Sequence, residues 1–175
     1  MKTLVVAILV MATNAAPKPR EVGANYFEPL DQSQIWVNVE PDLDGAAPVI
    51  INLTVAFPGL RLDRAPATVA VRAQPRCAPV VFPDRIRRPI LTFTVDRART
   101  FDLTARGRYD FVATCSGTPD TVIAPLTMAE LRAMANSKTA RVEALGFALA
   151  LTSGDLAAWR RFIQTVEHGI AIKYP

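Results

Sequence analysis

The sequence predicts a β-rich α+β fold, in which a β-sandwich carries a C-terminal helix–β-hairpin–helix segment. Apolar and polar side chains alternate along several short segments between residues 35 and 115, as they do in half-buried strands. After Pro125 the apolar residues recur instead at the spacing of amphipathic helices, with one hairpin pattern between them. Hydrophobic residues make up 50% of the 175-residue chain, which indicates a globular protein with a sizeable core.

The N-terminus has the organisation of a cleavable secretory signal peptide. Lys2 is followed by nine apolar residues, from Leu4 to Ala12, and then by small residues up to Ala15. A basic start, a short apolar run and a small-residue exit are typical of such signals, and spanning a bilayer takes about 20 apolar residues. We expect cleavage after Ala15. The alternative is a buried N-terminal strand.

We therefore divide the chain into four parts. Residues 1–15 are expected to be the signal peptide, and residues 16–34 a Pro-rich, extended lead-in. Residues 35–124 are expected to form the sandwich, and residues 125–175 the helix–hairpin–helix subunit packed on it.

Two strands are predicted in the first half of the sandwich. In residues 49–57, apolar side chains occupy every second position, and Asn52 and Thr54 point to the opposite face. In residues 35–40, Trp36 lies opposite Ile35 and its apolar neighbours. We expect it either on a second buried face or on an exposed face, where it can contact a partner. Asn52 also belongs to an Asn-Leu-Thr glycosylation pattern, which we treat as a chance match.

Further strands are predicted downstream. Residues 68–72 form one, residues 91–95 and 101–104 pair as a hairpin turning at residues 96–99, and alternation resumes at Tyr109. Leu103, Gly107 and Tyr109 stand at the spacing of a tyrosine corner, which resembles immunoglobulin-like sandwiches and implies that architecture. The chain departs from the antibody pattern at Phe111, where the second cysteine would be expected.

The two cysteines predict a disulfide bond. An even cysteine count in an exported chain favours pairing of Cys77 with Cys115. The bridge would close a loop of about 38 residues, stabilise by roughly 3–4 kcal/mol in the chain-entropy model and tie down the Pro-rich connection 74–89. Two buried free thiols are the alternative.

Two helices are predicted in the last quarter. Thr127 and Glu130 have the spacing of a capping box, and a second helix begins at Thr152 and ends at His168-Gly169. The hairpin between them spans residues 140–151. Two sets of apolar residues fall on single helical faces: Met128, Leu131, Met134 and Ala135 in the first helix, and Leu156, Trp159, Phe162, Ile163 and Val166 in the second.

No catalytic or metal-binding motif is recognisable. His168 is the one histidine, and its place at a helix end predicts a capping role. Asp42 and Asp44 precede Gly45 as in a turn, and the glutamate that a calcium loop needs is missing. We expect no cofactor and no metal ion, and we predict that the protein is not an enzyme.

Charge is unevenly distributed along the chain. Eleven arginines and four acidic residues lie between Arg61 and Arg108, whereas residues 21–44 carry only acidic charges. Such asymmetry indicates a surface for an anionic partner, although a genome rich in arginine codons would produce it too. The candidate binding residues are Arg85, Arg87, Arg88, Arg97, Arg99 and Trp36.

These observations favour an exported, non-catalytic binding or adaptor protein of the bacterial cell envelope, periplasmic or secreted. Its partner would be an anionic envelope component or another protein. We expect no nucleic-acid partner and no transmembrane segment in the mature chain. The alternatives are a secreted inhibitor that inserts segment 74–89 into a hydrolase, and a hydrolase that uses two carboxylates.

Mass spectrometry of the native protein tests export directly. We expect an N-terminus at Ala16 and two cysteines that do not react with an alkylating reagent until a reductant is added. An intact leader together with two free thiols would contradict both the compartment and the disulfide.

Overall fold

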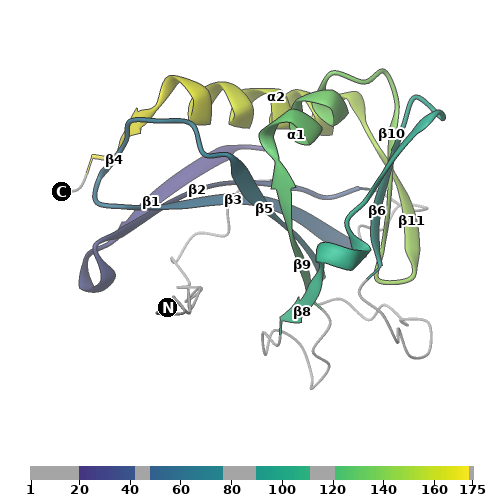
Figure 1. Ribbon diagram of the computed structural model, residues 1–175, viewed down its shortest axis with the longest axis horizontal. Helices are drawn as coiled ribbons and strands as arrows, with labels where there is room; N and C mark the ends of the chain where they lie inside the picture. The colour runs from purple at the N-terminus through teal and green to yellow at the C-terminus, as the bar shows by residue number, and fades with distance from the viewer. Residues whose placement is uncertain (1–19, 42–47, 77–89, 111–120, 174–175) are drawn as a thin grey trace.

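The computed structural model describes residues 20–41, 48–76, 90–110 and 121–173, with the side chains of Tyr109 and Asp110 excepted (Figure 1). Its strands are β1 (Val22–Phe27), β2 (Gln32–Val39), β3 (Val49–Pro58), β4 (Arg61–Leu62), β5 (Thr68–Pro75), β6 (Leu91–Val95), β7 (Arg99–Asp102), β8 (Arg108–Asp110), β9 (Thr121–Thr127), β10 (Ala140–Ala144), β11 (Phe147–Leu151) and β12 (Ile170–Ala171). The α-helices are α1 (Met128–Ala135) and α2 (Ser153–His168), and the short 3-10 helices are η1 (Glu28–Leu30) and η2 (Thr104–Arg106).

The described strands form two main sheets, so the predicted strand-rich α+β class is confirmed. The larger sheet has six strands in the order β1-β2-β3-β5-β9-β8, and the smaller has four in the order β11-β10-β6-β7. Every neighbouring pair is antiparallel, and a short β12-β4 pair lies apart from both sheets.

One face of the larger sheet, here called the inner face, packs against the helices. Figure 1 shows α1 and α2 lying across the same side of this sheet. Alternate residues of β2 and β3 are buried there, among them Ile35 and Leu53, neither of which has any exposed surface. The opposite, outer face carries the intervening side chains, including Trp36 and Thr54, as the alternation predicted.

The two helices present the apolar stripes that their spacing predicted. All nine predicted stripe residues are buried, and both helices begin with a complete capping box, at Thr127–Glu130 and at Thr152–Asp155. Burying each large apolar side chain contributes roughly 1.5–3 kcal/mol. Gly169 ends α2 with φ +75°, and a β-carbon there would lie 2.5 Å from the Leu62 carbonyl oxygen, so only glycine fits.

The smaller sheet shares the core of the larger one. The hairpin β10-β11 matches the predicted hairpin, and β10 also pairs with β6. Phe93 on β6 meets Trp159 on α2 edge-to-face, with ring centroids 5.8 Å apart. The segments on either side of residue 125 thus contribute strands to one sheet, and β9 runs across that position.

Three strands of the larger sheet depart from the sequence predictions. Residues 22–27, expected in an extended lead-in, form edge strand β1, and β2 begins at Gln32. Asp31 makes the hairpin between them by adopting a left-handed conformation with φ 45°. Strand β9 was not predicted. Strands β1 and β9 lack clear polar–apolar alternation, so pairing with neighbouring strands decides their conformation.

A long-range ion pair ties the start of the described chain to α2. Asp155 is fully buried, and its Oδ1 accepts a 2.8 Å hydrogen bond from Arg20 Nε. Its Oδ2 accepts from the backbone N–H and the hydroxyl of Thr152. Arg161 in turn donates to the Arg20 carbonyl oxygen at 2.9 Å. The contact holds the segment that precedes β1 against the N-terminus of α2.

Removing Arg20 should destabilise the fold. Replacing Arg20 by Ala leaves a buried carboxylate without its cation, and we expect a loss of about 1–2 kcal/mol in the free energy of unfolding, because the guanidinium is 46% exposed. Urea unfolding of Arg132→Ala is the matched control. It breaks an exposed pair with Glu167 and should cost less than about 0.5 kcal/mol. Equal losses in the two variants would contradict the argument.

Candidate ligand-binding site

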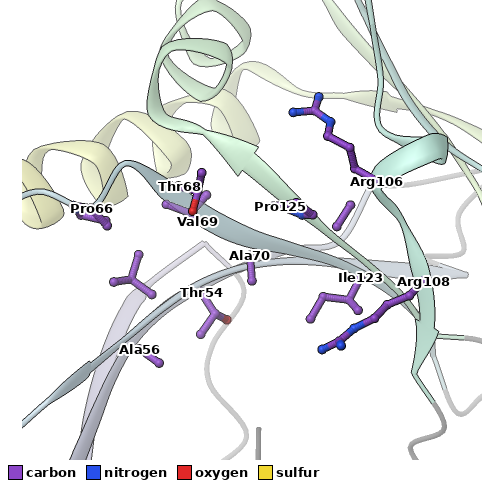
Figure 2. Close-up of a pocket in the computed structure, with 12 residues that line it drawn as sticks. Thr54, Ala56, Pro66, Thr68, Val69, Ala70, Arg106, Arg108, Ile123 and Pro125 are labelled. Atoms are coloured by element: carbon purple, nitrogen blue, oxygen red, sulfur yellow. The ribbon is translucent and has the colours of Figure 1, made fainter. Parts of the chain in front are cut away.

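A pocket of about 430 Å³ opens on the larger sheet across β3, β5, β9 and β8. Figure 2 shows Thr54, Ala56 and Ala70 directed into the space below the sheet, on its outer face. The lining residues are Thr54, Val55, Ala56, Pro66, Thr68, Val69, Ala70, Arg106, Arg108, Ile123, Ala124 and Pro125. None of them is acidic.

The pocket exists because the outward positions of β3 and β5 carry small side chains. Ala56 and Ala70 leave space where the larger residues of other strands would fill it. Pro125 lies opposite Ala70 in β9, beyond the last β8–β9 pair, Arg108 with Ile123. No residue of β8 pairs with Pro125, so the lack of an N–H group in this proline removes no hydrogen bond between β9 and β8.

Arg108 supplies positive charge to this pocket. It pairs with Ile123 at the edge of the sheet, its side chain is exposed, and Figure 2 shows the guanidinium reaching below the sheet towards Ile123 and Thr54. Within the described ranges, no hydrogen bond or ion pair engages this guanidinium. Five N–H donors are thus available to a ligand.

Arg106 is a near neighbour with a different role. Figure 2 shows its side chain on the other side of the sheet from Arg108. Its two terminal nitrogens donate to both carboxylate oxygens of Glu130 on α1, at 2.9 and 3.2 Å. These hydrogen bonds lower the pKa of Glu130 to about 2, helped by Thr127 and opposed by partial burial. They also raise the pKa of Arg106. Glu130 therefore neutralises Arg106.

The residues proposed from sequence fall in different places. Arg97 is in the turn between β6 and β7, and Arg99 begins β7, where its guanidinium carbon lies 4.5 Å from the Phe101 ring centroid. Both belong to the smaller sheet, apart from the pocket. The remaining arginines proposed, at positions 85, 87 and 88, lie outside the described residues, as do Cys77, Cys115 and the Asp42–Asp44 turn.

Trp36 lies on the outer face, as predicted, one strand from the pocket. Its side chain is partly exposed, and its direct partner on β3 is Thr54, which lines the pocket. On its other side it pairs with Gly23 of β1. The structure thus brings Trp36 and Arg108 onto one face, whereas the sequence had grouped Trp36 with arginines of the smaller sheet.

Arg108 was not singled out from the sequence. It was one of eleven arginines in a run, and nothing in the run distinguishes it, because the identity of its neighbours depends on strand pairing. Asn52 is on the polar face as predicted. His168 is in the last turn of α2 as predicted, with Nδ1 2.7 Å from the Gln164 carbonyl oxygen.

Comparisons with protein-family models, with curated proteins and with solved structures found no match to this chain. Among the residues described, no helix has the length and apolar character needed to cross a lipid bilayer. The described residues also contain no group of three or more His, Cys, Asp or Glu side chains that could hold a metal ion.

The Glu130–Arg106 pair should make stability depend on acidic pH. The folded-state pKa of Glu130 is lowered from 4.5 to about 2, so its stabilisation is fully present above about pH 4.5 and is lost as the pH falls towards 2. We expect about 1–2 kcal/mol, reduced by solvent screening because the Arg106 side chain is 36% exposed.

Urea unfolding of Glu130→Gln at acidic and neutral pH tests this. The variant should be less stable than wild type near pH 7 and approach it near pH 2. Glu143→Gln is the control, because that exposed carboxylate on β10 has no ion-pair partner among the described residues. A constant difference between Glu130→Gln and wild type at all pH values would contradict the assignment.

Proposed function

We propose that this chain is an exported, non-catalytic binding protein of the bacterial cell envelope that holds an anionic envelope component on the outer face of its larger sheet. The observation that carries the proposal is the Arg108 guanidinium, which projects into a pocket without a partner among the described residues. Its N–H donors are exposed, so they are accessible to an anionic ligand.

The electrostatics of the pocket favour an anion. Among the described residues, its lining contains two arginines and no acidic side chain, and Glu130 neutralises only Arg106. The net positive charge of the lining thus comes from Arg108. A guanidinium binds carboxylate or phosphate oxygens with two parallel hydrogen bonds, and such charge-assisted bonds are stronger than neutral ones.

A binding role fits the lining better than catalysis does. The described lining consists of Thr, Val, Ala, Pro, Ile and Arg, so these residues offer neither a pair of carboxylates nor a histidine for proton transfer. The hydrolase alternative would require two close carboxylates, and the inhibitor alternative depends on segment 74–89. Residues 77–89 of that segment lie outside the described part of the chain.

Export belongs to the same proposal. The leader at residues 1–15 and pairing of Cys77 with Cys115 would place the folded chain in an oxidising compartment, periplasmic or extracellular. We also propose the immunoglobulin-like sandwich as its architecture. Support comes from the two sheets that share one core and from buried Leu103, which lies just before Gly107 and β8.

Binding of a labelled short-chain polyphosphate tests the anion site. Arg108→Ala should weaken binding about five- to tenfold, equivalent to roughly 1–1.4 kcal/mol, because one guanidinium contact is lost. Wild-type affinity should also fall as salt rises from about 50 to about 500 mM.

Arg141→Ala is the matched control for this measurement. Arg141 is an exposed strand arginine of the smaller sheet, without an ion-pair partner in the described chain, so its loss removes equal charge at a different site. Binding that is independent of salt, or that falls equally in both variants, would overturn the proposal.

A further inference from the structure

Trp36 lies flat against a glycine on the neighbouring strand. A β-carbon built on Gly23 would be 2.5 Å from both Cε2 and Cζ2 of the Trp36 indole and 2.9 Å from its Nε1. The ring therefore occupies the space above Gly23 that any other side chain would take. The indole thus packs over Gly23 of β1 and remains partly exposed on the outer face of the sheet.

Beside this ring, polar side chains are held in a fixed orientation. Asn52 Nδ2 donates to Asn38 Oδ1 at 2.7 Å, and the Thr54 hydroxyl donates to Asn52 Oδ1. Because these bonds use the Asn38 oxygen and the Thr54 proton, the Asn38 amide N–H groups and the Thr54 oxygen lone pairs remain to engage a ligand. The donor on β2 and the acceptor on β3 are thus linked through Asn52, and both lie near Trp36.

The ring and the anion pocket form one continuous surface. Trp36 pairs with Thr54, Thr54 with Ala70, and Ala70 with Pro125, and the last three residues line the pocket. Strand β8 with Arg108 follows β9. Four strand spacings separate β2 from β8, which is about 19 Å at 4.8 Å each. A ligand that reaches both ends is therefore longer than a single ring.

We propose that this surface binds a chain of sugar residues that carries carboxylate groups, with one pyranose ring on Trp36 and one carboxylate on Arg108. The inference rests on the proposed function for the Arg108 end. At the Trp36 end, the slightly positive C–H edges of a pyranose face the negative π cloud of the indole. Its hydroxyls, each both donor and acceptor, match Asn38 and Thr54.

A sugar chain fits this surface better than a peptide. Extended peptides gain affinity by adding a strand to an open sheet edge, and β2, β3 and β5 are paired on both sides. The pocket floor is made of small side chains, such as Ala56 and Ala70, and none of the described lining residues is aromatic. A flat, hydroxyl-rich chain needs only the ring, the fixed polar groups and the guanidinium.

The test measures binding of three probes to the full mature chain: tetragalacturonate, its fully methyl-esterified and therefore neutral form, and a tetraglutamate peptide. Tryptophan fluorescence gives a direct signal, because Trp159 is fully buried and a change on binding reports on Trp36. Isothermal calorimetry gives affinities for variants that lack the indole.

Two variants act on the ring. Trp36→Ala removes it, and Gly23→Ala displaces it while keeping tryptophan in the chain, because the added carbon occupies the position of the indole. Each should weaken tetragalacturonate binding about five- to tenfold. Asn25→Ala is the control, since it alters the same strand two residues away on the same face. Thermal unfolding establishes that every variant is folded.

The probes separate this inference from the function on which it rests. We expect Arg108→Ala to weaken only the charged sugar, and Trp36→Ala to weaken both sugars. Tetragalacturonate binding that needs Arg108 but is unchanged in Trp36→Ala and Gly23→Ala would overturn the inference and leave the function standing. Tighter, Arg108-dependent binding of tetraglutamate would assign the site to an acidic peptide instead. No salt-sensitive binding of any charged probe would overturn both.

Discussion

Burial of the inner face of the larger sheet under α2 is the constraint on which the rest of the molecule depends. Trp159 and Phe162 have no exposed surface, and Trp159 also contacts Phe93 of the smaller sheet. One helix thus joins two sheets into one core. Because side chains of a strand alternate between faces, a shift of one residue would expose this apolar set, so burial fixes the register of strands such as β2 and β3.

The outer face follows from that register. Once Ile35, Leu53 and Val71 are buried inward, Trp36, Thr54 and Ala70 must point outward and lie in one row. Stability therefore depends on one set of residues and the candidate site on the alternate set, which is free to carry small and polar side chains. Small and polar side chains at these outward positions reduce the stability of the fold only a little, because the outward residues of β3 and β5 contribute little apolar burial.

Arg106 and Arg108 are close in sequence, but their positions in the fold give their guanidinium groups different surroundings. Arg106 belongs to a short helical turn and meets Glu130, which already caps α1, so its charge serves to hold η2 against that helix. Arg108, two residues later, has entered a strand and points to the other face. A carboxylate is within reach of the first guanidinium, and among the described residues none meets the second.

The sequence by itself determined the elements whose signals are local: the helices from Thr127 and Thr152, the strands with clear alternation, and the outward face of Trp36 and Asn52. It did not determine β1 or β9, whose residues lack alternation, nor the choice of Arg108 from a run of arginines. Those depend on which strands pair, through hydrogen bonds and packing between residues far apart in the chain. Gly23 lies under the Trp36 ring because β1 pairs with β2, and that pairing is set by the tertiary structure.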